Sequence, residues 1–304
     1  MAYKIFIDGS AGTTGLQLAE RLTKYISAGA VEITALPREL RKNDAAKASV
    51  MNTADLVFLC LPDEAARASV ALITNPSVKV IDTSTAHRVS DDWVYGFSEL
   101  SAKQKQAICG TTRLSNPGCH ATGAIAILAP LTHAGIIPPD YPIAITSVSG
   151  YTGGGKSAIA EYEDADRSAE YDAPRAYALT ARHKHIPEII KYAGLTKTPA
   201  FIPLICDFPQ GMQVMIPLCL PGKRRQIFET LSEHYSDAPD ISVTDDIPIY
   251  ASGNEHAGTD KLTLRVAGND ETILITAQFD NLGKGAAGAA LQNMRLMLGL
   301  DERK

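Results

Sequence analysis

The feature that most constrains the fold is a glycine-rich turn directly after a short apolar segment at the N-terminus. Residues 3–8 (YKIFID) predict a buried strand, and a helical pattern follows over about 16–26. Between them, Gly9, Gly12 and Gly15 form a G-x-x-G-x-x-G pattern. Glycines at such a turn let the backbone approach a pyrophosphate, which the N-terminus of the next helix then binds. The pattern predicts a dinucleotide site, although any tight strand–helix turn can carry glycines.

Strands and helices alternate through the first half of the chain and give way to longer strands in the second. In the first half, further strands are predicted at 32–36, 55–61 and 78–82, and a helix at 64–73. Alternation of this kind predicts βαβ units and a parallel sheet. In the second half, strands are predicted at 141–148, 213–220, 261–266 and 272–279.

We therefore predict an α/β protein with two domains. The first is a Rossmann-like parallel sheet over residues 1–116 that binds NADP. The second, over residues 117–283, is an α+β domain with a mixed sheet, and the family resemblance given below implies that it is the catalytic and oligomerisation domain. A terminal helix over 284–300 is expected to pack back on the first domain.

Composition excludes several classes of protein. The 304 residues are 45 % hydrophobic and 21 % charged, with a net charge of -5 and no basic block, so nucleic acid is not an expected partner. No stretch reads as a signal peptide or a membrane span. The five cysteines are scattered and include no CxxC pair, which predicts free thiols in a reducing cytoplasm and no zinc finger.

Charges after the second predicted strand bear on the choice of cofactor. An NAD site usually has an acidic residue there, to bind the ribose hydroxyls. Here Arg38 and Glu39 follow the strand, with Arg41 and Lys42 close behind. The cations favour binding of the 2′-phosphate of NADP, although the negative charge of Glu39 weakens that signal. The alternative interpretation is that these charged residues form the solvent-exposed start of a helix.

The segment SNPGCHAT places Cys119 after an Asn-Pro-Gly turn and before a helical pattern. Ala124, Ile127, Leu128 and Leu131 predict one buried helix face. At a helix N-terminus, free N–H groups and the macrodipole favour the thiolate, which is a nucleophile. The alternative is a cysteine that only packs. With a nicotinamide cofactor, a thiolate predicts hemithioacetal or thioester chemistry on a carbonyl carbon.

The segment RHKHIPE supplies candidate acid–base groups. His183 and His185 point to the same side of an extended segment, and Pro187 fits the first turn of a following helix. Glu188 then lies near enough to orient a histidine. The alternatives are two surface histidines in a basic loop, or a metal pair, which lacks a third ligand nearby.

Two glycine-rich segments in the second half offer binding groups. Residues 149–156 (SGYTGGGK) follow a strand and can form a nest for a phosphate or carboxylate. Gly150, Gly155, Lys156 and Ser157 match the P-loop pattern G-x-x-x-x-G-K-[ST]. We interpret this match as accidental, because the segment does not follow the first strand of a nucleotide-binding fold. Residues 281–288 (NLGKGAAG) open the last helix with small residues, which suit close packing or the approach of a nicotinamide equally well.

These motifs together resemble the N-acetyl-gamma-glutamyl-phosphate reductases of arginine biosynthesis, in their shorter form. The resemblance rests on GSAGTTG, NPGCHAT, SGYTGGGK, HKHIPEI and KGAAGAALQNM, and covers nearly the whole chain. It implies reduction of N-acetyl-glutamyl 5-phosphate by NADPH to N-acetyl-glutamate 5-semialdehyde, with release of phosphate. It also implies a homodimer or homotetramer and a small-molecule substrate, with no metal.

The resemblance implies roles for particular residues. Cys119 would be the nucleophile that carries the acyl group as a thioester; His185, or alternatively His183, would move protons, with Glu188 as its orienting partner. The cofactor would be bound by Gly9, Ser10, Gly12, Thr13, Thr14, Gly15, Arg38, Ser84, Asn281 and Lys284. The substrate would be bound by Asn116, Ser149, Gly150 and Lys156.

Three other functions remain open at this point. An aspartate-type semialdehyde dehydrogenase would share the fold and the chemistry, but the HKHIPEI motif speaks against it. A cysteine acyltransferase or hydrolase would not bind NADPH. A catalytically silent regulator would bind the cofactor without a reactive Cys119.

Overall fold

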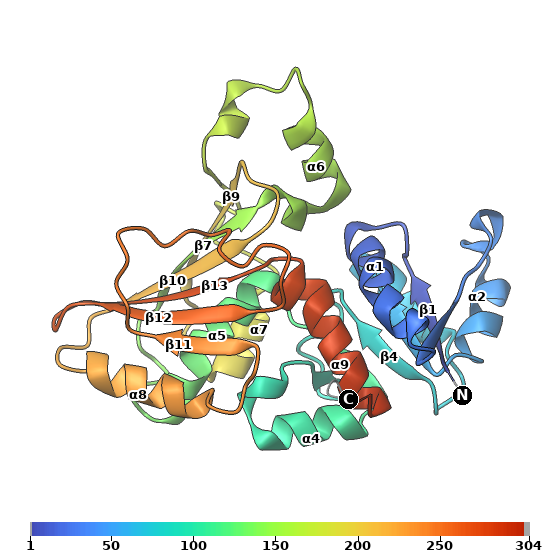
Figure 1. Ribbon diagram of the computed structural model, residues 1–304, viewed down its shortest axis with the longest axis horizontal. Helices are drawn as coiled ribbons and strands as arrows, with labels where there is room; N and C mark the ends of the chain where they lie inside the picture. Colours follow the sequence, from blue (N-terminus) through green and yellow to red (C-terminus); the bar gives the residue numbers. More distant parts are fainter. Residues whose placement is uncertain (1, 301–304) are drawn as a thin grey trace. The chain divides into compact units, whose positions relative to one another are not determined.

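A computed structural model of the protein describes residues 2–300 as two units (Figure 1). Unit 1 comprises the described residues up to Gly118 together with those from Ala286 onward. Unit 2 comprises Cys119–Gly285.

Unit 1 contains a six-stranded sheet in the order β2-β1-β3-β4-β6-β5, with every neighbouring pair parallel. This confirms the predicted Rossmann-like parallel sheet. The strands are β1 (Tyr3–Asp8), β2 (Val31–Thr34), β3 (Leu56–Leu59), β4 (Lys79–Asp82), β5 (Val94–Tyr95) and β6 (Arg113–Ser115). The helices are α1 (Thr13–Ser27), α2 (Asp44–Met51), α3 (Asp63–Ala71), α4 (Ala102–Gly110) and α9 (Gly288–Leu298).

The last helix belongs to the core of unit 1. Leu291, Met294 and Met297 of α9 are buried in one cluster with Ile5 of β1 and Leu18 of α1. Burial of large apolar side chains contributes about 1.5–3 kcal/mol for each one. The cluster therefore ties the two distant segments of unit 1 together.

Unit 1 differs from the predicted pattern in several features, and β5, β6 and α4 were not predicted. Helix α1 begins at Thr13, directly after its N-cap Gly12, and not near residue 16. Helix α2 was not predicted, because its sequence DAAKASVM shows no clear apolar stripe. Its start is fixed by a capping bond instead: the Asn43 side chain accepts a hydrogen bond from the Ala46 backbone N–H at 2.9 Å.

Unit 2 contains a seven-stranded mixed sheet in the order β11-β12-β13-β10-β7-β9-β8. Its strands are β7 (Ala144–Gly150), β8 (Arg175–Ala176), β9 (Ala200–Cys206), β10 (Met212–Leu218), β11 (Ile241–Thr244), β12 (Leu262–Gly268) and β13 (Ile273–Phe279). Its helices are α5 (Cys119–His133), α6 (Gly155–Glu163), α7 (Ile186–Ala193) and α8 (Arg224–His234). The predicted mixed sheet is confirmed, while β9, β11 and α8 were not predicted.

Helix α5 packs against β10 and β13 on one side and against α7 and α8 on others (Figure 1). Every residue from His120 to Leu131 is buried, including Pro130 in the helix interior. The four residues of the predicted buried face are therefore buried, and so are the residues on the other faces of this stretch. Alanines and a glycine fill the positions between the large apolar residues, so the helix has no polar side and is enclosed all round.

Candidate functional site

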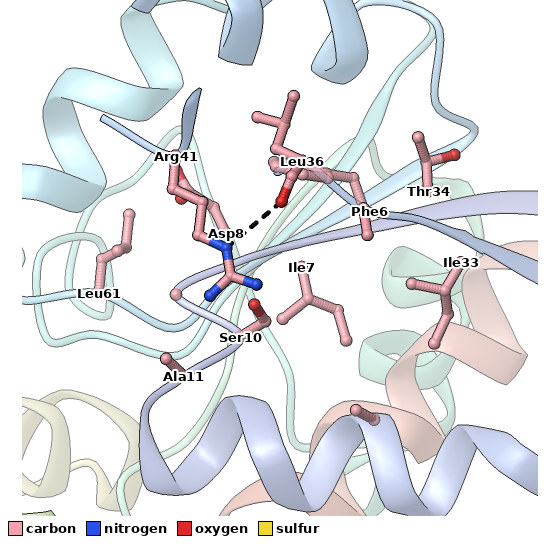
Figure 2. A pocket seen from close by; sticks show the side chains of 13 residues that line it. Phe6, Ile7, Asp8, Ser10, Ala11, Ile33, Thr34, Leu36, Arg41 and Leu61 are labelled. Atoms are coloured by element: carbon pink, nitrogen blue, oxygen red, sulfur yellow. Dashed lines mark hydrogen bonds between the residues drawn. The ribbon is translucent and has the colours of Figure 1, made fainter. Parts of the chain in front are cut away.

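A pocket of about 210 Å³ lies in unit 1 at the carboxyl end of β1 (Figure 2). Gly9, Ser10 and Ala11 of the predicted glycine turn line one part of it. The end of β2 and the segment after it line another, with Leu36 and Arg41. In a parallel α/β sheet this edge, beside a helix N-terminus, is where dinucleotides bind.

The glycine turn has the geometry that a pyrophosphate requires. Gly9 has φ +88°, and a Cβ atom there would lie 2.2 Å from the carbonyl oxygen of Cys60. Only glycine therefore fits between the turn and the end of β3. Gly12 is the N-cap of α1, and the buried Oγ1 atom of Thr13 has no hydrogen-bond partner within residues 2–300. Such an orphaned hydroxyl at a helix N-terminus fits a phosphate oxygen.

Arg41, and not Arg38, lines the pocket. Its guanidinium group reaches into the pocket on the side of Ser10, while its Nε atom donates to the Leu36 carbonyl oxygen at 3.4 Å (Figure 2). Arg38 is exposed in the first turn after β2 and does not line the pocket. A short helical turn, Arg38–Leu40, separates the two and carries them to different positions.

Ser84 lies at the same edge of the sheet, beyond the end of β4. Its hydroxyl and its backbone N–H both donate to Asp82, at 2.8 and 2.9 Å. The same carboxylate pairs with Nδ1 of His87 at 2.6 Å, and the His87 ring stacks on Trp93. The Ser84 side chain is therefore held within a buried polar group of the protein.

In unit 2, Cys119 is the first residue of α5 and is half-buried. It lies at the N-terminus of a helix that the fold encloses completely. The backbone of Gly285 approaches it closely, because a Cβ atom on Gly285 would lie 3.0 Å from the Cβ of Cys119. The structure thus places this cysteine where the helix dipole stabilises a negative charge on sulfur.

Three histidines gather in unit 2. The rings of His183 and His185 lie 4.8 Å apart between centroids, and each lies 5.4 Å from the ring of His120. His185 is the N-cap residue of α7 and is buried, as is Glu188 in the first turn of that helix, while His183 is half-buried. The predicted pair is therefore brought together beside a third histidine.

Sequence reasoning missed His120 and its partners. The His120 ring is buried, with Nδ1 2.7 Å from the Ser147 hydroxyl and Nε2 2.7 Å from the Tyr177 hydroxyl. Burial, together with the charges of His183 and Lys184, lowers the pKa of His120 to about 3. The position of His120 directly after Cys119 was an available signal, whereas nothing local distinguishes Tyr177.

The predicted substrate loop lies at the end of β7. Ser149 is buried and donates to the Gly150 carbonyl oxygen at 3.0 Å, while Lys156 is exposed in the first turn of α6. Asn281 holds this loop: its Nδ2 donates to the Thr152 hydroxyl at 3.0 Å, and its Oδ1 accepts from Gly211 at 2.9 Å. The Asn281 amide is thus engaged within unit 2.

Two other predicted residues are buried near the ends of unit 2. Lys284 is 2 % exposed, in a π-helical turn (Gly283–Ala287) that precedes α9. Asn116 belongs to unit 1, where its Nδ2 donates to the Ala286 carbonyl oxygen at 3.0 Å and its Oδ1 accepts from Asn293 at 3.1 Å. Both side chains therefore sit inside the protein, close in sequence to Cys119 and Gly285.

The remaining cysteines differ among themselves. Cys206 is buried and Cys60 is half-buried, and burial raises the pKa of the Cys60 thiol to about 12, which keeps that thiol protonated. Cys109 and Cys219 are exposed. Among residues 2–300, no group of His, Cys, Asp and Glu side chains is arranged to hold a metal ion.

Comparison with known proteins places the chain in a family. Residues 4–108 match the NAD binding domain of semialdehyde dehydrogenases, and residues 119–281 match their dimerisation domain. An N-acetyl-gamma-glutamyl-phosphate reductase of Burkholderia lata is 44 % identical to this chain over 97 % of it and 96 % of the relative. The corresponding reductase of Sinorhizobium fredii is also 44 % identical, over 98 % of this chain and 99 % of its own. The chain belongs to the N-acetyl-gamma-glutamyl-phosphate reductase family.

Membership in this reductase family makes the protein an oxidoreductase with a nicotinamide dinucleotide cofactor. The pocket, the Gly9 turn and the orphaned Thr13 hydroxyl fit that cofactor. Solved structures of aspartate semialdehyde dehydrogenases share the reductase's fold. That of Vibrio cholerae has a TM-score of 0.75 over 99 % of both chains at 15 % identity, and that of Francisella tularensis 0.72 over 97 % of this chain and 99 % of its own at 14 %. No helix among the described residues is long and apolar enough to cross a bilayer.

Proposed function

We propose that this protein reduces N-acetyl-glutamyl 5-phosphate to N-acetyl-glutamate 5-semialdehyde with NADPH, releasing phosphate, as a step of arginine biosynthesis. The observation that carries the proposal is the position of Cys119 at the N-terminus of an enclosed helix, in one unit with His183 and His185. The names of relatives that are 44 % identical along nearly the whole chain support the substrate.

In this proposal Cys119 is the nucleophile. Its sulfur attacks the acyl carbon, the carbonyl electron pair moves to oxygen, and collapse expels phosphate and leaves a thioester. The nicotinamide cofactor, when bound, supplies the hydride that reduces this thioester. The resulting thiohemiacetal then loses Cys119 as the leaving group, a proton passes from its hydroxyl to a base, and the aldehyde is released.

Histidines 183 and 185 move the protons. The backbone N–H of His185 donates to Nδ1 of His183 at 3.2 Å, so a neutral His183 carries its proton on Nε2 and acts as a donor there. We assign removal of the Cys119 proton to His185 and the positioning of His185 to Glu188, one helical turn later. Both residues are almost fully buried, which limits competition from water.

We assign cofactor-binding and substrate-binding roles to residues of both units. Gly9, Ser10, Gly12, Thr13, Thr14 and Gly15 would surround the pyrophosphate, and Ser84, Asn281 and Lys284 would position the nicotinamide end or the loops beside it. We assign the 2′-phosphate of NADP to Arg41 in place of Arg38, because Arg41 lines the pocket. Ser149, Gly150, Lys156 and Asn116 would bind or position the substrate.

The proposal extends to assembly and location. The match of residues 119–281 to a dimerisation domain supports a homodimer or homotetramer. The free cysteines and the biosynthetic reaction support a cytoplasmic enzyme. Size-exclusion chromatography with light scattering would measure the oligomeric state, and a monomer would contradict the proposed assembly.

The reverse reaction tests the function, because the acyl phosphate is unstable. Purified protein is given N-acetyl-glutamate 5-semialdehyde, inorganic phosphate and NADP, and NADPH formation is followed at 340 nm. We expect phosphate-dependent reduction of NADP that is stronger than with aspartate semialdehyde. We expect Cys119→Ser to abolish it while leaving NADP binding intact. A protein that binds NADP but turns over neither aldehyde would overturn the proposed reaction.

A further inference from the structure

His120 sits at the centre of a chain of three hydrogen-bonding side chains in unit 2. Nδ1 lies 2.7 Å from the Ser147 hydroxyl, and Nε2 lies 2.7 Å from the Tyr177 hydroxyl. Ser147 is completely buried and His120 is 4 % exposed. None of these residues was needed for the proton transfers described above.

The number of protons on these three side chains fixes which group donates each hydrogen bond. His120 is neutral at working pH, because burial lowers its pKa to about 3, so one ring nitrogen donates and the other accepts. Within residues 2–300, the Ser147 hydroxyl has only Nδ1 of His120 as a hydrogen-bond partner. If Nδ1 carried the proton, the Ser147 proton would be left buried without an acceptor, at a cost of about 1–3 kcal/mol.

The favoured arrangement therefore has Ser147 donating to Nδ1 and Nε2–H donating to the Tyr177 oxygen. The proton of the Tyr177 hydroxyl then points away from His120 and is available to another acceptor. Burial raises the pKa of Tyr177, and the charge of nearby Cys119 raises it further, so the hydroxyl stays protonated. Because Tyr177 contacts the ring of His120, the residue that follows Cys119, its protonated hydroxyl is a hydrogen-bond donor on the nucleophile's side of unit 2.

We propose that Tyr177 donates a hydrogen bond to the oxyanion formed when Cys119 attacks an acyl carbon, and that Ser147 and His120 are positioning residues that orient its hydroxyl. The S–C bond forms, the carbonyl π pair moves to oxygen, and that oxygen accepts the Tyr177 bond. Collapse restores the carbonyl and breaks the bond to the leaving group, while the tyrosine keeps its proton. This inference rests on the proposed role of Cys119 and adds a residue to it.

Two reactions of the same sulfur separate this role from a structural one. Attack on p-nitrophenyl acetate forms an oxyanion and releases p-nitrophenolate, whereas alkylation by iodoacetamide displaces iodide and forms none. We expect Tyr177→Phe to slow the acylation burst about 100-fold, the effect of removing one oxyanion donor, and to change alkylation less than about twofold. Tyr141→Phe is the matched control, because it loses a hydroxyl bound at 2.9 Å to the Cys219 N–H elsewhere in unit 2, and it should change neither rate.

A double-mutant cycle tests the orienting chain. We expect Ser147→Ala to slow acylation about tenfold in the presence of Tyr177, and less than about twofold in the Tyr177→Phe background. Ser242→Ala, which loses a hydroxyl contact of 3.0 Å with Thr263, is its control. If Ser147→Ala does not fold, His120→Asn takes its place, because the amide keeps a partner for Ser147 but cannot reach Tyr177.

The outcomes are distinct. Selective and coupled loss of acylation supports the proposal. Equal loss of acylation and alkylation, or additive effects of the two substitutions, overturns it. Neither probe uses the aldehyde or the cofactor, so the result holds even if the protein fails to turn over N-acetyl-glutamate 5-semialdehyde, which would overturn only the proposed function.

Discussion

Gly285 and Cys119 approach so closely that a Cβ atom on the glycine would lie 3.0 Å from the Cβ atom of the cysteine. The backbone of the segment after β13 thus forms one wall beside the nucleophile. The Phe279 ring and the Asp280 carbonyl oxygen lie 3.3 and 3.1 Å from the same position, so the wall cannot easily move.

We expect Gly285→Ala to lower kcat about tenfold or more in the aldehyde-dependent assay, because displacing a nucleophile by a fraction of an ångström misaligns its attack. Gly110→Ala is the control: nothing lies within 4 Å of its Cβ position, and its activity should be unchanged. An unaltered kcat for a folded Gly285→Ala protein would show that this wall does not position the sulfur.

Arg41 is expected to determine the preference between the two nicotinamide cofactors. Arg41→Ala removes a cation that lines the pocket, so we expect the Kd of NADPH to rise about tenfold or more, with little change for NADH. Fluorescence titration with both cofactors measures this. Arg38→Ala, outside the pocket lining, should have the smaller effect. The assignment fails if Arg38→Ala is the more damaging or if both cofactors weaken alike.

Gly9 is expected to be the most sensitive position of the glycine turn. Gly9→Ala adds a clash at 2.2 Å with the Cys60 carbonyl oxygen to the strain of φ +88°, so the free energy of unfolding should fall by about 3 kcal/mol or more. Gly29→Ala is the matched control, with φ +66° and nothing within 4 Å, and should lose only about 1 kcal/mol. Urea unfolding of both variants measures the two losses in free energy of unfolding. Equal losses would mean that the turn relaxes to accommodate the Cβ atom at position 9.

His120 is expected to lower the free energy of unfolding as the pH falls below about 6.5. Its pKa is about 3 in the fold and about 6.5 when unfolded, so between these values the unfolded chain binds the additional proton. The stabilising contribution of the neutral ring is complete above pH 6.5 and is lost as pH falls towards 3, by up to roughly 1.4 kcal/mol per pH unit. His183, Lys184, His185 and Tyr177 are titratable groups around it.

The comparison of wild type with His120→Asn isolates this contribution from that of the carboxylates. We expect the free energy of unfolding to fall more steeply from pH 7 to pH 5 in wild type than in the variant. Parallel pH dependences would show that the fold does not lower the pKa of His120.

The sequence predicted the order of elements well where periodicity was strong. Strands β1 and β13 and the sheet class of each unit follow from apolar runs and their spacing. Helix α8 was missed because polar residues dominate it, and only tertiary packing buries Ile227 and Leu231. The enclosure of α5 on every side also depends on which elements surround it, which no local pattern encodes.

For the candidate site, the sequence by itself determined the chemical groups and their local setting: a cysteine at a helix start, a histidine pair before a helix and glycines in a strand–helix turn. These follow from local rules, because turns, caps and periodicity depend on neighbours in the chain. Only the tertiary structure decided that Arg41 and not Arg38 enters the pocket, and that Ser147, His120 and Tyr177 join across three separate segments of the chain. Such contacts arise from the packing of a whole unit, since hydrogen bonds between distant segments form only where burial brings those segments together.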